Sequence, residues 1–163
     1  MLGNASYPFN SRDQPHQLRE RLVEAETFLG ILMDVMSLEN DVDDPSDFIV
    51  KVLELICHST KRAIGIAWLL DRSSDRLVYR THVDVHHIET AKFVEVVQRS
   101  SWASGEGLPG RVWCERAPIW LANVASEPKS IRKEVALEAG LKSSFAFPIQ
   151  ARQGVIGVME FFG

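Results

Sequence analysis

Apolar residues recur at alternating spacings of four and three along the first long periodic segment of the chain. They are Leu18, Leu22, Ala25, Leu29, Leu32 and Met36. This is the a/d seam of a heptad repeat, so the sequence predicts one long helix over residues 13–40. The seam suits a parallel homodimer. The whole stripe could instead cover the sheet of its own chain, because Phe28, Met33 and Val35 widen it. Residues 1–12 lack an apolar period and are expected to form a loose N-terminus.

A second helix is predicted to begin after the acidic break at residues 41–44. Asp44 can serve as its N-cap, Pro45 as its first residue and Asp47 as a first-turn acid that the helix dipole favours. The helix should end between residues 59 and 62. It has a broad apolar face, which indicates a core helix and comprises Phe48, Ile49, Val52, Leu53, Leu55 and Ile56.

The rest of the chain alternates between strand and helix patterns. Residues 64–70 and 77–81 read as one antiparallel hairpin, and residues 143–149 and 155–162 as another that turns at 152–154. A strand is predicted over 118–124, and helices are predicted over 88–98 and 130–139. Strands in hairpins with helices between them predict an α+β fold. The fold would contain an antiparallel sheet of five to six strands, helices on the faces of this sheet and a long N-terminal helix.

Composition narrows the function classes. A length of 163 residues with 45% apolar content can bury one sizeable core. The formal charge of −4, with basic residues scattered among acids, argues against a nucleic-acid surface. No apolar run is long enough to span a membrane, and the first residues lack a secretory pattern. We therefore expect a cytoplasmic protein in which Cys57 and Cys114 stay reduced.

A glycine-rich turn leads straight into an apolar helical turn. It is Gly105-Glu106-Gly107-Leu108-Pro109-Gly110-Arg111-Val112-Trp113, and Pro118-Ile119-Trp120-Leu121 follows it. Glycines and a proline at these positions force a tight turn with positive φ, which is a packing device. Together with Ile66-Ala67-Trp68-Leu69-Leu70-Asp71, Phe145-Ala146-Phe147-Pro148-Ile149 and Gly157-Val158-Met159-Glu160-Phe161-Phe162, this pattern resembles the GAF domain of bacterial signalling proteins.

The resemblance implies a sensory or regulatory domain over residues 41–163. GAF sequences of this kind run on into a final amphipathic helix that is missing here. The chain would then be the N-terminal part of a longer protein, such as a two-component sensor histidine kinase or a cyclic-di-GMP enzyme of the diguanylate cyclase type. Its partners would be a second copy of itself, a small molecule and an output domain in the same polypeptide.

The same resemblance places a small-molecule pocket among aromatic residues. The residues that it offers for ligand contact are Trp68, Tyr79, Arg111, Trp113, Trp120, Phe145 and Phe147, and Trp102 belongs to the same aromatic group. Ring faces suit a planar ligand, and Arg111 could balance a carboxylate or phosphate. Core packing is the stronger interpretation for each ring taken singly, because a sheet of this size needs several large side chains to fill its core.

Signals for catalysis or a cofactor are weak. His82, His86 and His87 lie close together, and His82 and His86 would project to the same side of an extended segment. No third ligand for this pair is evident, so no metal site is expected. Cys57-His58 is similar to the bilin attachment dipeptide of GAF photoreceptors, but it lies too early in the chain, so no covalent bilin is expected and the cofactor stays unknown. GAF enzymes that reduce free methionine sulfoxide rely on several cysteines around the pocket, which two distant cysteines do not reproduce.

No paired carboxylates, nucleophile triad or phosphate-cradling loop is visible, so no catalytic residue is assigned and this segment is not expected to be an enzyme. The sequence leaves three functions open. They are a small-molecule sensor that relays through a helical dimer, a ligand-free dimerisation and protein-interaction module, and a tetrapyrrole- or haem-bearing sensor or methionine sulfoxide reductase.

Overall fold

The computed structural model describes residues 30, 44–85, 90–126 and 132–163. The predicted loose terminus over 1–12 lies outside these residues. So does the predicted helix over 13–40 apart from Gly30, together with its proposed dimer seam.

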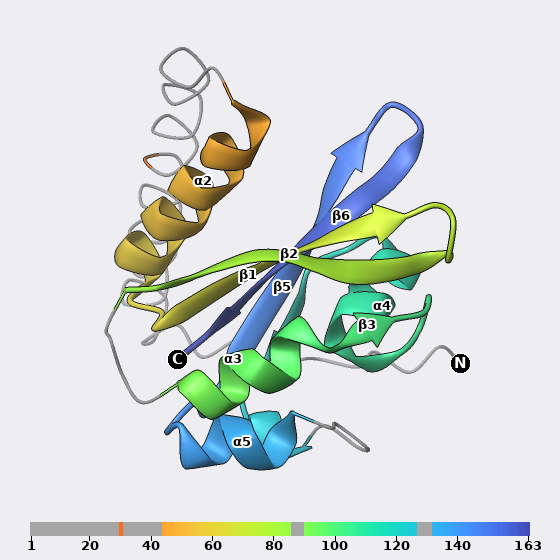
Figure 1. Ribbon diagram of the computed structural model, residues 1–163. Coiled ribbons are helices and arrows are strands. Elements are labelled where there is room, and N and C mark those ends of the chain that lie inside the picture. Colours follow the sequence, from red (N-terminus) through yellow and green to blue (C-terminus); the bar gives the residue numbers. More distant parts are fainter. Residues whose placement is uncertain (1–29, 31–43, 86–89, 127–131) are drawn as a thin grey trace, which may run out of the picture.

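The described elements form a sheet with helices on both faces (Figure 1). Their order is α2 (Pro45–Thr60), β1 (Ile64–Asp71), β2 (Arg76–Asp84), α3 (Ala91–Gln98), β3 (Ser101–Trp102), α4 (Gly107–Glu115), β4 (Ile119–Leu121), the 3₁₀ turn η1 (Val124–Ser126), α5 (Lys133–Glu138), β5 (Ser144–Ala151) and β6 (Gly154–Phe162). The six-stranded sheet has the order β3-β2-β1-β6-β5-β4, and every neighbouring pair is antiparallel. This confirms the predicted α+β class.

Helix α2 forms as the sequence predicts. The Asp44 carboxylate accepts a hydrogen bond from the Ser46 backbone N–H at 2.7 Å and so satisfies a donor that the first turn leaves unpaired. The helix ends where Lys61 takes the left-handed conformation, with φ 54°. Its apolar side packs on one face of the sheet, called the outer face below, where Leu53 and Cys57 are completely buried.

Two strands differ from the prediction. The strand expected over 118–124 stops at Leu121, because Asn123 accepts a hydrogen bond from the Ala125 N–H through its side chain, at 2.9 Å, and turns the chain into η1. The edge strand β3 was not predicted, since two residues carry no periodicity. The helices expected over 88–98 and 130–139 appear as α3 and α5, and residues 86–89 and 127–131 lie outside the described part of the chain.

The glycine signature fits α4 tightly against the segment that precedes it. Gly107 has φ +57°, and a Cβ atom there would lie 2.7 Å from the Trp102 ring. A Cβ on Gly110 would lie 2.1 Å from the Ala103 carbonyl oxygen. Only glycine fits both positions, so the first turn of α4 can rest on the Trp102 ring.

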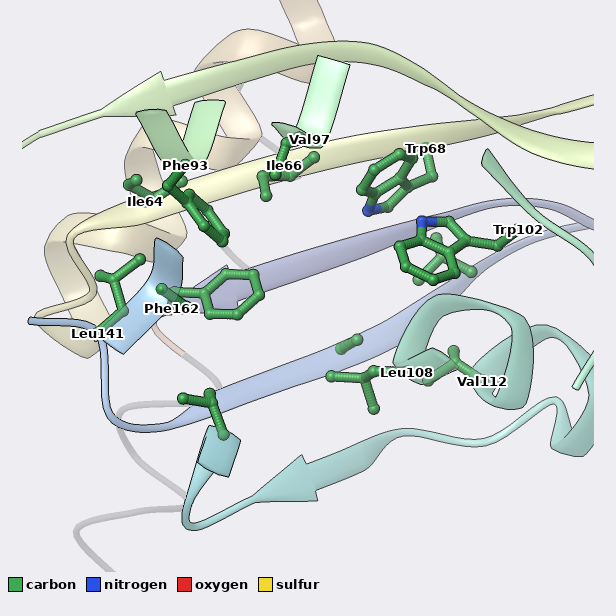
Figure 2. Packing of buried hydrophobic residues seen from close by; sticks show 14 of the residues in the cluster. Ile64, Ile66, Trp68, Phe93, Val97, Trp102, Leu108, Val112, Leu141 and Phe162 are labelled. Atoms are coloured by element: carbon green, nitrogen blue, oxygen red, sulfur yellow. The ribbon is translucent and has the colours of Figure 1, made fainter. Parts of the chain in front are cut away.

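The sheet separates two apolar clusters. The outer cluster lies between the sheet and α2 and includes Leu53, Cys57 and Phe161. The inner cluster lies between the sheet and α3, α4 and α5, where Figure 2 shows Trp68 and Trp102 close together above Leu108 and Val112 of α4. The candidate site lies in this inner layer.

Candidate functional site

Two opposite charges are buried in the inner layer. Glu160 is fully buried, and Arg132 is 4% exposed. The Arg132 guanidinium donates to both Glu160 carboxylate oxygens, from Nη1 to Oε2 at 2.7 Å and from Nη2 to Oε1 at 2.8 Å. A planar guanidinium held by two parallel bonds is the strongest geometry available to such a pair.

Strand register places the carboxylate. Glu160 lies on β6, opposite Ile66 of β1 on one side and Ala146 of β5 on the other. Because side chains alternate along a strand, Glu160 shares the inner face with Val158 and Phe162. Trp68 is the diagonal neighbour on β1, and its indole Nε1–H donates to Glu160 Oε2 at 3.0 Å.

Aromatic rings surround the guanidinium carbon of Arg132. This atom lies 4.7 Å from the Trp102 ring centroid, 5.4 Å from that of Phe162 and 5.6 Å from that of Trp68. These distances are within the range of cation–π attraction. The rings also pack on one another, since Trp68 and Trp102 meet edge to face with centroids 5.9 Å apart. The site is therefore a carboxylate within an aromatic cage, and the guanidinium of Arg132 occupies it.

A small cavity of about 20 Å³ adjoins this group. Its lining includes Trp102, Leu121, Val124, Arg132, Lys133, Ala136, Ser144, Glu160 and Phe162. Among the described residues, no hydrogen-bond partner is found for the buried Trp102 Nε1 or Ser144 Oγ. A single water molecule needs roughly 10–15 Å³ and polar partners, so the cavity can hold one water but not a larger molecule.

The structure brings only part of the predicted ligand-contact set to this site. Trp68 belongs to it directly. Tyr79 lies farther along the inner face, with its ring 6.4 Å from that of Trp68 and its hydroxyl 2.7 Å from His82 Nδ1. Arg111 and Trp113 are half-buried on α4, and neither lines the cavity.

The other predicted contacts belong to a different surface. Trp120 is 68% exposed on the edge strand β4 and stacks on Phe145 with centroids 6.1 Å apart. Phe145 and Phe147 pack in the outer cluster with Phe161, on the α2 side of the sheet. The sheet thus lies between these residues and the buried ion pair.

Glu160, Arg132 and Ser144 were not singled out from the sequence. One signal was available for Glu160. It is the only charged residue of the nine in β6, and the residues two positions away on either side, which share its face of this buried strand, are apolar. No comparable signal marks Arg132, which precedes a helix of only six residues.

The thiols lie away from the site. Burial, followed by the nearby charges of Asp84 and Glu54, raises the pKa of Cys57 to about 12, and this side chain belongs to the outer cluster. Cys114 is exposed near the end of α4. The helix turns that side chain away from the buried Val112, which lies on the opposite side of α4.

The histidine group is only partly described. Burial lowers the pKa of His82, and Asp84 opposes the shift. His86 and His87 lie outside the described residues, and within those residues no cluster of three metal-ligating side chains is found. No described helix is long and apolar enough to cross a membrane.

Solved structures share this fold. The GAF domain of a phosphoenolpyruvate-protein phosphotransferase from Coxiella burnetii matches with a TM-score of 0.65 and 19% identity, over 85% of this chain and 78% of that one. The nlh2 GAF domain of A. aeolicus, in an inactive state, matches with a TM-score of 0.65 and 15% identity, over 85% and 80%. Free methionine-R-sulfoxide reductase from Neisseria meningitidis, in complex with its substrate, matches with a TM-score of 0.62 and 17% identity, over 98% and 81%.

No curated protein matches the sequence. Residues 42–163 match the model of the GAF domain. These residues contain every element of the described sheet, the glycine signature and the buried ion pair. The chain therefore belongs to the GAF domain family.

Proposed function

We propose that this GAF domain, a sensory and regulatory module, binds a small organic molecule in the inner layer, beside Arg132 and Glu160. The supporting observation is the buried polar group itself. A layer that served only as packing would be apolar, because burying a charged pair costs more desolvation than an apolar pair of equal volume. Here an ion pair and two further polar atoms meet at one cavity.

Binding would require the site to open. A cavity of about 20 Å³ is far below the roughly 300–1,000 Å³ of ordinary ligand pockets. A ligand must therefore bind a second arrangement of the domain in which a side chain has left the inner layer. A ligand that prefers this arrangement shifts the population toward it, which is the basis of a sensor.

We further propose that the signal passes to an output domain of the same polypeptide through paired helices formed by residues 13–40. The heptad seam from Leu18 to Met36 supports this relay, and the helix would lead directly into α2. The output domain would be a histidine kinase or a cyclic-di-GMP enzyme in a bacterial cytoplasm. In this proposal the segment itself has no catalytic role.

A native mass spectrum of the freshly purified chain tests both parts. A retained small molecule would appear as a mass excess, and a dimer would appear as a doubled mass. The ligand should also raise the melting temperature Tm of the chain, and the shift should keep growing as the free ligand concentration exceeds Kd. Chains without any bound mass, together with no Tm shift across a library of metabolites, would contradict ligand binding.

Two variants locate the ligand. Ser144→Val fills the cavity and removes its hydroxyl, so the ligand-induced Tm shift should disappear. Trp120→Ala is the matched control. Trp120 is exposed on β4 and stacks on Phe145 of the outer cluster, so this variant should leave the shift intact. A shift that is lost with Trp120→Ala and kept with Ser144→Val would place the ligand on the outer surface instead.

A ligand-free interaction module is the second candidate. The near-complete filling of the inner layer favours it, since Trp68, Trp102, Arg132 and Phe162 already occupy the space between the sheet and α5. A dimer of bare chains with an unresponsive Tm would support this function. The thiols do not favour a reductase, because Cys57 lies across the sheet from the cavity and Cys114 is exposed.

A further inference from the structure

The inner site has the composition of a receptor for an organic cation. Glu160 offers both carboxylate oxygens, and the faces of Trp102, Phe162 and Trp68 surround the bound guanidinium. Ring faces carry negative electrostatic potential, so a carboxylate within an aromatic cage attracts cations and repels anions. The chain fills this receptor with its own Arg132.

The receptor and its occupant belong to different parts of the fold. Trp68, Glu160 and Phe162 stand on β1 and β6, the two central strands of the sheet, and Trp102 stands on β3. Arg132 is the N-cap residue of the six-residue α5, a helix that packs against α3 and η1. The receptor can therefore keep its shape when Arg132 moves out.

We propose that Glu160, Trp68, Trp102 and Phe162 form a binding site for a small organic cation of guanidinium or ammonium type, and that Arg132 is a built-in occupant which this cation displaces. The proposal rests on the ligand-binding function above and names the class of ligand. A planar guanidinium fits best, because Arg132 shows that two parallel hydrogen bonds to Glu160 fit the site, at 2.7 and 2.8 Å.

Charge balance selects a cation over an anion. An anionic ligand would have to draw Arg132 from Glu160, which would leave a fully buried carboxylate without a counterion. An external cation exchanges one positive charge for another and keeps Glu160 paired. Trp102 and Ser144 line the cavity, and their indole N–H and hydroxyl groups can then donate to water or to an acceptor atom of the ligand.

Chemical rescue of Arg132→Ala tests the proposal. This variant vacates the cage and leaves Glu160 unpaired, so its Tm should fall well below that of the wild-type chain. Methylguanidinium chloride should raise the Tm with the logarithm of its concentration above Kd, by about 5 °C or more at roughly 100 Kd. Fluorescence of Trp68 and Trp102 should report a saturable binding curve with the same Kd. Methylammonium and tetramethylammonium should rescue less, because neither can form the parallel pair of bonds, and sodium chloride should not rescue.

Two controls separate the site from a general salt effect. Arg132→Ala/Glu160→Gln keeps the vacated cage but lacks the carboxylate, so methylguanidinium should not raise its Tm. Arg62→Ala removes a different cation–π contact, over Phe145 at 5.4 Å in the outer cluster, and should not respond either. Equal responses in all three variants, or no response in Arg132→Ala, would overturn the proposal.

The test still works if Arg132→Ala does not fold by itself. The variant is then refolded from urea with and without methylguanidinium, and the yield of soluble, cooperatively melting protein is measured. A yield that rises only with the guanidinium compound supports the site, and an unchanged yield rejects it. A neutral or anionic compound that raises the wild-type Tm while rescue fails would reject the cation site and leave the ligand-binding function standing.

Discussion

At the scale of single residues, the Glu160–Arg132 pair determines how the inner layer is arranged more than how stable it is. Removing one partner of a buried ion pair costs roughly 3–5 kcal/mol, whereas replacing both with apolar residues is often neutral. The aromatic rings and the Trp68 N–H fix the pair in one geometry. The pair is therefore better explained by the fixed geometry that it imposes on the inner layer than by a contribution to net stability.

Gly107 offers a residue-scale prediction. Gly107→Ala combines the strain of φ +57° with a Cβ atom 2.7 Å from the Trp102 ring, whereas Gly140→Ala has φ +75° but meets nothing within 4 Å. Gly140→Ala should cost about 1–2 kcal/mol of unfolding free energy from backbone strain. Gly107→Ala should cost an additional ~1–3 kcal/mol and shift the tryptophan emission, because the ring must move.

Urea unfolding of both variants followed by fluorescence measures the difference. Equal losses of unfolding free energy would mean that the first turn of α4 can move away from Trp102 without cost. That result would count against the tight seating of α4 on β3.

At the scale of elements, local patterns predicted what local physics decides. Helix α2 and both hairpins were predicted because caps, turn residues and alternation lie within a few positions of one another. The edge strand β3 and the ion pair were not, since Arg132 and Glu160 are 28 residues apart and meet only through strand register. Likewise, the resemblance grouped Phe145 with Trp68, while strand parity puts them on opposite faces.

Three elements are joined by one exposed ion pair. Arg76 of β2 donates to the Ser101 carbonyl of β3 and to the Glu106 carboxylate before α4, both at 2.8 Å. The Ala103 backbone N–H and, next, Arg76 lower the pKa of Glu106 below its ordinary value of 4.5. A lowered folded-state pKa contributes stability that is present above the unfolded value and lost as pH falls through the folded one.

Glu106→Gln should therefore reduce the unfolding free energy at neutral pH by less than about 1 kcal/mol, because the side chain is half exposed and solvent screens the pair. The difference from the wild-type chain should shrink once the pH drops below 4.5, the ordinary Glu value. Urea unfolding across this range measures it, with Glu115→Gln at the other end of α4 as the control. A difference that does not change with pH would show that the carboxylate charge is not involved.

At the scale of the whole molecule, the central strand β6 connects the two layers. Glu160 points into the inner layer, and its neighbour Phe161 points into the outer one, where it stacks on Phe145 with centroids 4.9 Å apart. The outer layer contains α2, which follows the predicted signalling helix. A path from Glu160 to α2 therefore runs through a single strand, without any loop in between.

The two cysteines provide a reporter of this coupling. Cys57 is completely buried beneath α2 with its pKa raised to about 12, so it stays a protonated and shielded thiol near neutral pH, while Cys114 is exposed. An aromatic disulfide reagent should modify one thiol rapidly in the native chain and two in urea. Cys114→Ser should remove the fast phase, so that the slow phase measures how often α2 opens away from the sheet.

If Glu160 and α2 are coupled, occupancy of the inner site should change that slow rate, and Arg132→Ala should accelerate it until methylguanidinium is added. A slow rate that ignores both changes would mean that the two faces of the sheet open independently, and the signal would then have to leave the domain by another route.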